Sequence, residues 1–174
     1  KAVYDNKEIN AVIKVLRNSS LTLIDGKKVK QLEKSVSKIF GKKYGLMVNS
    51  GSSANLLALS SFNFKKGSEI ITPNLTFSTT VAPIYQLGLV PHFIDVGKNN
   101  FVANIDQIET AINRKTKAIM IPNLLGNVPD WKKIYKISKK YNLKIIEDSA
   151  DTIGYKLNNK NFGNCSDIST NSMY

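Results

Sequence analysis

Two neighbouring carboxylates, Glu147 and Asp148, follow an apolar run that begins at Leu143. This pattern predicts a buried parallel strand that presents carboxylates at its carboxyl end, the edge where open α/β sheets bind their ligands. A carboxylate there can cap a helix, bind a metal ion, act as an acid or base, or pair with a positively charged cofactor nitrogen. The two residues alone leave all four roles open.

A turn of small polar residues at positions 50–55 is the second candidate site, because it separates a predicted strand from an apolar helix. Free amides at a helix start, together with the small side chains of Ser52 and Ser53, suit a phosphate group. The turn has neither the lysine of a P-loop nor the glycine spacing of a dinucleotide-binding turn. An ordinary serine N-cap is the alternative, and the turn by itself favours it.

Three single residues narrow the possible chemistry. Phe77 opens a predicted helix and can be either a core residue or a flat face for an aromatic ligand; burial preferences favour the core. His92 is the only histidine, which excludes a histidine-clustered metal site and an internal Ser/His/Asp triad, and a half-buried place on a strand is predicted for it. Cys165 is the only cysteine, which excludes an internal disulfide and a cysteine-based zinc site and suits a reducing cytoplasm.

Strands must alternate with helices to bring these residues to one edge. The apolar pattern predicts strands at residues 44–49, 69–72, 90–95, 118–122 and 143–148, and helices at 56–59, 76–87 and 130–141. Such alternation is typical of βαβ units with right-handed crossovers, and predicts a mainly parallel sheet with helices on both faces. A hairpin-like excursion is predicted at 154–163 and a further strand at 166–174.

Two amphipathic helices are predicted before this α/β region. Asp5 and Glu8 form a capping box for the first helix, and the second ends at Gly41, a good left-handed C-cap. We therefore expect an N-terminal helical segment over residues 1–43 and an α/β domain over residues 44–174. The sequence starts without a methionine and stops inside a predicted strand, so we expect it to be part of a longer protein whose α/β domain is incomplete at the C-terminus.

The net charge of +12 suggests an alternative class of function, which the details of the sequence argue against. Clustered cations bind phosphate backbones, so a basic α/β module that binds nucleic acid or an acidic polymer is the alternative to an enzyme. Only Arg17 and Arg114 can make two-pronged contacts to phosphate or guanine, and the lysines fall on predicted helix faces. No apolar run approaches the roughly 18 residues of a membrane span. We expect a cytoplasmic protein that binds neither nucleic acid nor a membrane.

In combination, the motifs resemble those of the DegT/StrS-type sugar aminotransferase family, in order and spacing along nearly the whole chain. They are Asn49-Ser-Gly-Ser-Ser-Ala-Asn55, Thr76-Phe-Ser-Thr-Thr80, Gly88-Leu-Val-Pro-His-Phe-Ile-Asp95, Ile146-Glu-Asp-Ser-Ala-Asp151 and Ser169-Thr-Asn-Ser-Met-Tyr174. The resemblance implies a vitamin B6 enzyme with the aspartate aminotransferase fold. The chain would be the large domain of a fold-type I transferase, truncated before the small domain. Family members are usually dimers that act on nucleotide-linked keto sugars in surface polysaccharide (lipopolysaccharide and O-antigen) biosynthesis.

The resemblance also assigns residues to the cofactor, which is pyridoxal 5'-phosphate or pyridoxamine 5'-phosphate. Ser52 and Ser53 would hold the phosphate through backbone amides and a hydroxyl, joined by Ser172. Phe77 would stack on the pyridine ring. Asp148 would pair with the ring nitrogen, whose protonated form a carboxylate favours.

Asp151 would lie near the 3-hydroxyl side of the ring. The family's Schiff-base lysine falls beyond Tyr174, at position 177 by family spacing, so no catalytic residue is expected within residues 1–174. Asp151 and the turn at 122–127 depart from the aminotransferase pattern and resemble the 3-dehydrase branch, which uses pyridoxamine phosphate and has histidine in place of the lysine. Such a dehydrase would need a reductase partner.

Overall fold

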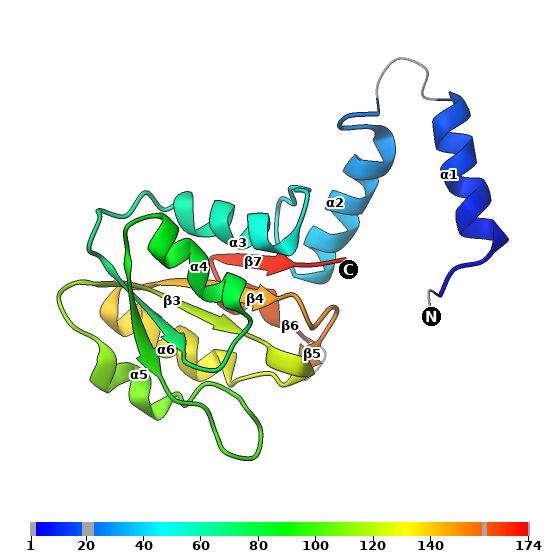
Figure 1. The fold of residues 1–174 in the computed structure, drawn as a ribbon. Coiled ribbons are helices and arrows are strands. Elements are labelled where there is room, and N and C mark those ends of the chain that lie inside the picture. The colour runs from blue at the N-terminus through cyan, green and yellow to red at the C-terminus, as the bar shows by residue number, and fades with distance from the viewer. Residues whose placement is uncertain (1–2, 19–22, 158–159, 174) are drawn as a thin grey trace.

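The computed structural model describes residues 3–18, 23–157 and 160–173. An α/β body follows two N-terminal helices, α1 (Asn6–Asn18) and α2 (Lys27–Ile39), of which α1 stands apart from the body (Figure 1). No residue of α1 is buried, and Ser37 is the one buried residue within α2. None of the helices in these described ranges is long and apolar enough to cross a bilayer.

Local signals explain the ends of both N-terminal helices, as predicted. Asp5 Oδ1 accepts a 2.7 Å hydrogen bond from the Lys7 amide, and Glu8 Oε2 accepts a 2.8 Å bond from the Asp5 amide. This is the capping box predicted from the sequence. At the end of α2, Gly41 has a φ of +63° and lets the Lys42 amide turn back to the Ser37 carbonyl at 2.7 Å.

A five-stranded sheet forms the centre of the body, in the order β2-β1-β3-β4-β7. Its strands are β1 (Glu69–Pro73), β2 (Val90–Ile94), β3 (Thr116–Pro122), β4 (Lys144–Ser149) and β7 (Ile168–Asn171). All four neighbouring pairs are parallel, so every strand ends at the same edge of the sheet. The predicted α/β fold class is confirmed.

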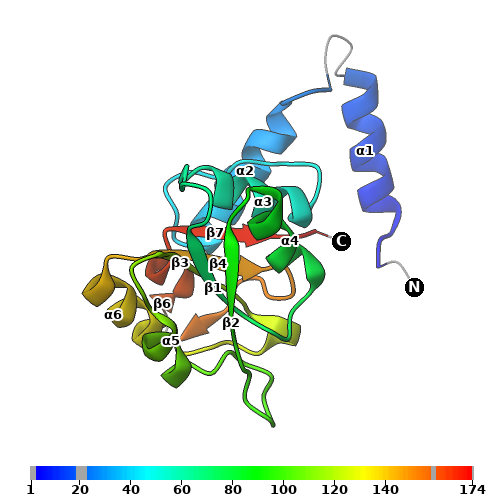
Figure 2. The same ribbon diagram turned by 60° about the vertical axis from the view of Figure 1, so that its left-hand side comes forward.

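Helices cover both faces of this sheet (Figure 2). One face carries α3 (Gly51–Ser60) and α4 (Ser78–Gln86), and the other carries α5 (Asp106–Ala111) and α6 (Trp131–Tyr141). Neighbouring strand residues point to opposite faces, so Ile146 packs in the cluster under α3 and α4 while Ile145 packs in the cluster with Trp131 and Ile108. The same alternation sends Glu147 and Asp148 to opposite sides of β4.

The strand predicted at residues 44–49 is wrong. These residues pair with no strand of the described chain, and Tyr44 is 77% exposed. The Met47 amide instead donates a 2.8 Å hydrogen bond to Glu33 Oε1 on α2. The apolar pattern is local, but a strand also needs a neighbouring strand with free backbone groups.

Two smaller features complete the body. The predicted hairpin is confirmed as the antiparallel pair β5 (Lys156–Leu157) and β6 (Lys160–Asn161), and residues 158–159 lie outside the described residues. The strand predicted at 166–174 is confirmed only over the four residues of β7, and its predicted end, Tyr174, also lies outside the described residues. The short helix α5 and the two turns of 3-10 helix, η1 (Leu124–Gly126) and η2 (Phe162–Cys165), were not predicted.

Candidate functional site

The start of α3 lies beside the end of β7. Ser50 caps the helix, because its Oγ accepts a 3.1 Å hydrogen bond from the Ser53 amide. The amides of Gly51 and Ser52 donate no hydrogen bond within the described part of the chain. These two amides point out of a helix N-terminus, where the helix dipole also favours an anion. The predicted serine cap is therefore present, and it leaves donors free.

Ser172 is brought to this helix start although about 120 residues of sequence separate them. A Cβ atom placed on Gly51 would lie 3.1 Å from Ser172 Cβ and 3.4 Å from Ser172 Oγ. Only a glycine leaves this approach unstrained, because such a contact is tighter than real Cβ atoms normally show. Ser172, which the resemblance assigned to the same group as Ser52 and Ser53, therefore lies against Gly51 at the start of α3.

Asp148 lies at the end of β4 with 5% of its surface exposed. Its Oδ2 accepts hydrogen bonds of 2.8 Å from Asn55 Nδ2 on α3 and from Thr80 Oγ1 on α4. Its Oδ1 accepts from the Ala150 amide at 3.2 Å. Its partners lie on two helices that precede it by many residues, so helix capping, the least specific of its possible roles, does not describe it.

Sequence reasoning missed Asn55 and Thr80, the two side chains that orient Asp148. Both are buried and polar, and they continue the network: Thr170 Oγ1 donates to Asn55 Oδ1 at 2.6 Å, and Thr76 Oγ1 donates to Thr80 Oγ1 at 2.8 Å. An asparagine inside the otherwise apolar run of α3 was the available signal, since buried amides need partners.

Phe77 is the N-cap residue of α4 and is 69% exposed, so the interpretation of Phe77 as a core residue is wrong. Phe77 follows Thr76 in the sequence. The Thr76 hydroxyl donates a hydrogen bond to Thr80, and the Thr80 hydroxyl donates one to Asp148. An exposed aromatic ring at the carboxyl edge of the sheet has a free face for a flat ligand.

Asp151 makes a contact that the sequence did not predict. Its Oδ2 accepts a 2.9 Å hydrogen bond from the amide of Leu125, which has a φ of +53°. A left-handed backbone costs energy in a leucine, and such strained residues cluster at functional sites. Asp151 therefore holds the turn after β3 next to the end of β4.

His92 and the possible metal ligands are the remaining candidates from the sequence. His92 lies half-buried on β2, as predicted, with Nδ1 3.3 Å from Glu69 Oε2. In the residues that the structure describes, no group of three or more His, Cys, Asp or Glu side chains could hold a metal ion. The carboxyl edge instead offers anion donors, an exposed ring and a buried carboxylate, which suit a flat ligand with a phosphate at one end and a basic nitrogen at the other.

Comparison with known proteins gives a consistent result. A family model described as "DegT/DnrJ/EryC1/StrS aminotransferase family" matches residues 3–174. GDP-4-keto-6-deoxy-D-mannose 3-dehydratase of Yersinia pseudotuberculosis is 39% identical over 168 residues, which are 93% of this chain and 42% of that protein. A dTDP-4-dehydro-2,6-dideoxy-D-glucose 3-dehydratase of Saccharopolyspora spinosa is 37% identical over 88% of this chain and 35% of its own length.

Solved structures agree with the sequence relatives. The GDP-4-keto-6-deoxy-D-mannose-3-dehydratase of E. coli with bound hydrated PLP superposes with a TM-score of 0.83 and 38% identity, over 92% of this chain and 42% of that one. The chain therefore spans less than half the length of the relatives it matches.

Proposed function

The chain belongs to the DegT/DnrJ/EryC1/StrS aminotransferase family, and on that premise we propose that it is the cofactor-binding part of a vitamin B6-dependent enzyme. Its substrate is a nucleotide-linked 4-keto sugar on the way to a surface polysaccharide such as lipopolysaccharide. The observation that carries the proposal is Asp148, a carboxylate buried at the ligand-binding edge of the sheet and held by two helices. We also propose the division into a helical segment, 1–43, and a cofactor-binding domain, 44–174.

Pyridoxal 5'-phosphate or pyridoxamine 5'-phosphate fits the residues at this edge. The free amides of Gly51 and Ser52, with the hydroxyls of Ser52, Ser53 and Ser172, supply phosphate donors, and a larger residue than Gly51 would fill the space between them. Phe77 supplies an exposed ring for stacking. When bound, such a cofactor supplies an electron sink through its protonated pyridine nitrogen.

Asp148 has the central role in this proposal. Its carboxylate would hold a proton on the ring nitrogen, because an opposite charge nearby favours the protonated form. Asn55 and Thr80 fix the direction of the carboxylate, so it needs no reorientation when the ligand arrives. Asp151 would lie toward the 3-hydroxyl side of the ring, and it holds the Leu125 turn beside the end of β4.

We favour 3-dehydration over transamination. The relatives reported above are 3-dehydratases, and Asp151 and the turn at 122–127 depart from the aminotransferase pattern. The deciding position is residue 177 of the longer protein, for which we propose histidine. A histidine there acts as the base for loss of the 3-hydroxyl, whereas a lysine serves amino-group exchange. A dehydrase of this kind requires a reductase partner.

The test uses the full-length protein with a nucleotide-linked 4-keto-6-deoxyhexose and pyridoxamine phosphate. Mass spectrometry should show a 3-deoxy 4-keto sugar that is lighter by one oxygen atom, with the two electrons supplied by pyridoxamine phosphate or by the reductase partner, and no glutamate-dependent amino sugar. An amino sugar formed only with glutamate, together with lysine at position 177, would replace dehydration by transamination. A protein that binds neither form of the cofactor would contradict the whole proposal.

The alternative, a basic module for nucleic acid or an acidic polymer, has one supporting feature. An open groove of about 410 Å³ lies at the opposite, amino edge of the sheet and is lined by Lys66, Arg114, Lys115 and Lys117. Polymer binding that weakens steeply with salt would favour this alternative, and selective binding of pyridoxamine phosphate would favour the enzyme.

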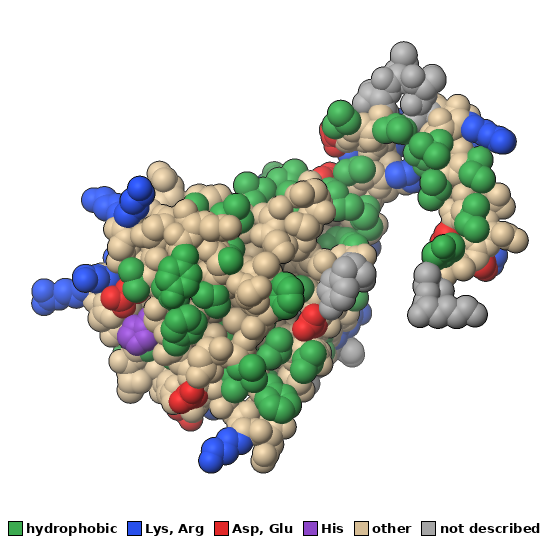
Figure 3. All heavy atoms as spheres, in the orientation of Figure 1, with side chains coloured by type: hydrophobic (Ala, Val, Ile, Leu, Met, Phe, Trp, Pro, Cys, Tyr) green, Lys and Arg blue, Asp and Glu red, His purple; other side chains and the backbone are tan. Residues whose placement is uncertain are grey.

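We propose a homodimer in the cytoplasm as the working form. Hydrophobic side chains run along the arm formed by α1 (Figure 3), and Ile9, Val12, Ile13 and Leu16 are all exposed there. A second copy that covers this stripe would remove it from water. Light scattering of the full-length protein should give twice the mass of one chain, and replacement of Val12 and Leu16 by serine should shift it toward the monomer.

A further inference from the structure

The face of β4 opposite Asp148 carries a second buried carboxylate, Glu147, which the proposed reaction does not use. Glu147 is 2% exposed and accepts hydrogen bonds from four side chains. Asn123 Nδ2 (3.1 Å) and Ser149 Oγ (2.8 Å) donate to Oε1, and Ser166 Oγ (3.1 Å) and Ser169 Oγ (2.8 Å) lie at Oε2. Each of the two carboxylate oxygens of Glu147 therefore accepts two side-chain hydrogen bonds.

Lys42 brings a positive charge to the same network. Its ammonium donates to Ser166 Oγ at 3.0 Å and to the carbonyl oxygens of Gly163 and Ser166. Three oxygen acceptors match the three N–H groups of a protonated lysine. Burial lowers the pKa of Lys42, and the charge of Glu147 acts in the opposite direction. Lys42 and Glu147 are therefore joined through the hydroxyl of Ser166.

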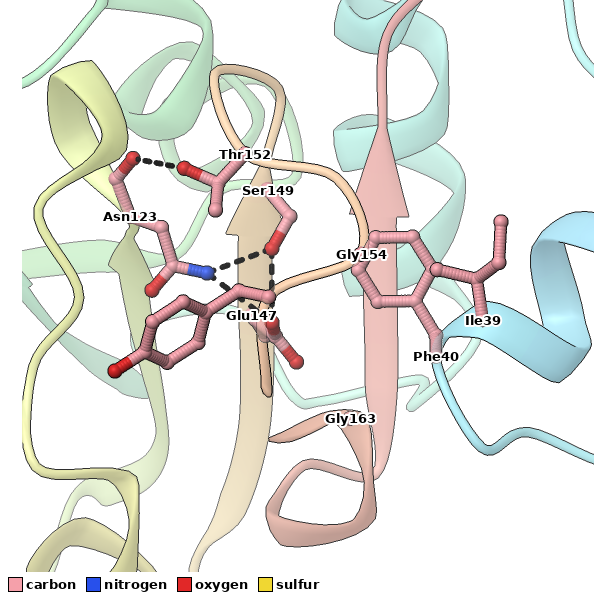
Figure 4. A pocket seen from close by; sticks show the side chains of 9 residues that line it. Ile39, Phe40, Asn123, Glu147, Ser149, Thr152, Gly154 and Gly163 are labelled. Carbon is pink, nitrogen blue, oxygen red and sulfur yellow. Dashed lines mark hydrogen bonds between the residues drawn. The ribbon is translucent and has the colours of Figure 1, made fainter. Parts of the chain in front are cut away.

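This pair connects distant parts of the chain. Lys42 follows α2, which packs Phe40 against the same small internal space as Glu147 and Gly163 (Figure 4). That space has a volume of about 10 Å³, room for about one water molecule. Glu147 is buried and Lys42 is half-buried, so each charge depends on the other and on its hydrogen-bond partners.

Asn123 links Glu147 to the backbone segment that carries Asp148 and Asp151. Its side chain donates to Glu147 and Ser149, while its amide donates to the Asp148 carbonyl at 2.8 Å. Its own carbonyl accepts from Thr152 Oγ1 at 3.0 Å (Figure 4). Asn123 thus fixes the backbone on both sides of Asp151, from Asp148 to Thr152. Trp131 Nε1 closes the network by donating to Asn123 Oδ1 at 2.9 Å.

We propose that Lys42 and Glu147 are positioning residues for the cofactor site: linked through Ser166, they hold Asn123, and Asn123 holds the segment 148–152 that carries Asp148 and Asp151. The inference rests on the proposed function for its meaning, but its structural content concerns this chain alone. If the pair only stabilised the fold, its loss would accelerate hydrogen exchange equally in all segments. If the pair positions the site, its loss accelerates exchange first in residues 148–152 and in the Leu125 turn.

The experiment compares Lys42→Met with Lys43→Met in the full-length protein. Lys43 is an exposed neighbour whose ammonium lies 5.0 Å from the ring centre of Tyr44. Hydrogen exchange measured on the cofactor-free proteins should be at least tenfold faster at residues 124–126 and 148–152 in Lys42→Met, with β1 and β3 within twofold of the parent. Lys43→Met should match the parent throughout. The dissociation constant of pyridoxal phosphate should rise about tenfold in Lys42→Met alone.

Ser166→Ala is the second variant, because it removes the bridging hydroxyl and leaves both charges in place. It should accelerate exchange in the same two segments about threefold, and it covers the case in which Lys42→Met fails to fold. Exchange that accelerates equally across the whole sheet, or not at all in 148–152, would overturn the inference. A parent protein that does not bind pyridoxal phosphate would contradict the proposed function, and the exchange data would still decide the role of the pair.

Discussion

Asn55 and Asp148 are 93 positions apart in the sequence, and a 2.8 Å hydrogen bond joins Asn55 Nδ2 to Asp148 Oδ2. Both side chains are buried, at 2% and 5% exposure. A hydrogen bond to a buried charge is stronger than one between neutral groups and is costly to lose. This hydrogen bond therefore fixes α3, whose start offers the anion site, relative to the end of β4, which carries the carboxylate.

Replacing Asp148 by asparagine in the full-length protein should leave folding largely intact and lower turnover about a thousandfold. The reason is loss of the negative charge beside the ring nitrogen, and a thousandfold corresponds to about 4 kcal/mol of barrier. Steady-state kinetics and thermal unfolding measure the two effects separately. Turnover within about threefold of the parent would reduce Asp148 to a structural carboxylate.

Replacing Asn55 by alanine should lower turnover by about 10- to 100-fold, because a hydrogen bond to a charged group contributes about 1.5–3 kcal/mol. Asn99→Ala, in an exposed loop, is the matched control and should be neutral. Equal activity of the two variants would show that Thr80 alone orients Asp148.

Replacing Gly51 by alanine should weaken phosphate binding about tenfold, since the new Cβ would lie 3.1 Å from Ser172 Cβ. Titration with pyridoxal phosphate, observed by its absorbance, measures the change. Gly26→Ala is the control, because nothing lies within 4 Å of a Cβ at that N-cap position. An unchanged affinity in Gly51→Ala would place the phosphate elsewhere.

Borohydride reduction of the full-length protein with pyridoxal phosphate, followed by peptide mapping, should label no single dominant lysine within residues 1–174. The catalytic position is proposed at residue 177, and no lysine is among the six residues assigned to the cofactor. One strongly labelled lysine in this range would mean that the catalytic position has been misplaced.

Glu69 should make the protein more stable above about pH 4.5 than below it. Its pKa lies below the ordinary value of 4.5, chiefly because Asn113 donates a hydrogen bond to it, with a further hydrogen bond and charge from His92. A carboxyl whose folded pKa is lowered stabilises the folded state above its unfolded pKa, and this contribution is lost as the pH falls through the folded value. Urea midpoints between pH 3 and pH 6 should therefore depend less on pH in Glu69→Gln than in the parent, and Asn113→Ala should show part of the same change.

Sequence patterns located the strands β1 to β4, the helix α6 and the carboxylates at the end of β4, because apolar runs and their spacing are local properties of the chain. The capping box at Asp5 and the turn at Gly41 were predictable for the same reason. The strand at 44–49 failed because pairing depends on another segment. The resemblance to a family supplied the six cofactor residues, and their roles remain predictions for the experiments above.

By itself, then, the sequence determined the α/β alternation, the position of Asp148 at a strand end and the capped turn that leads into α3. Only the tertiary structure decided that Asp148 faces Asn55 and Thr80, that Phe77 is exposed, and that Lys42 reaches Glu147 through Ser166. These contacts join residues up to 124 positions apart. Contacts between distant side chains depend on the order of the strands and on the face to which each strand residue points. A local pattern of polar and apolar residues does not determine the strand order or which strands become neighbours.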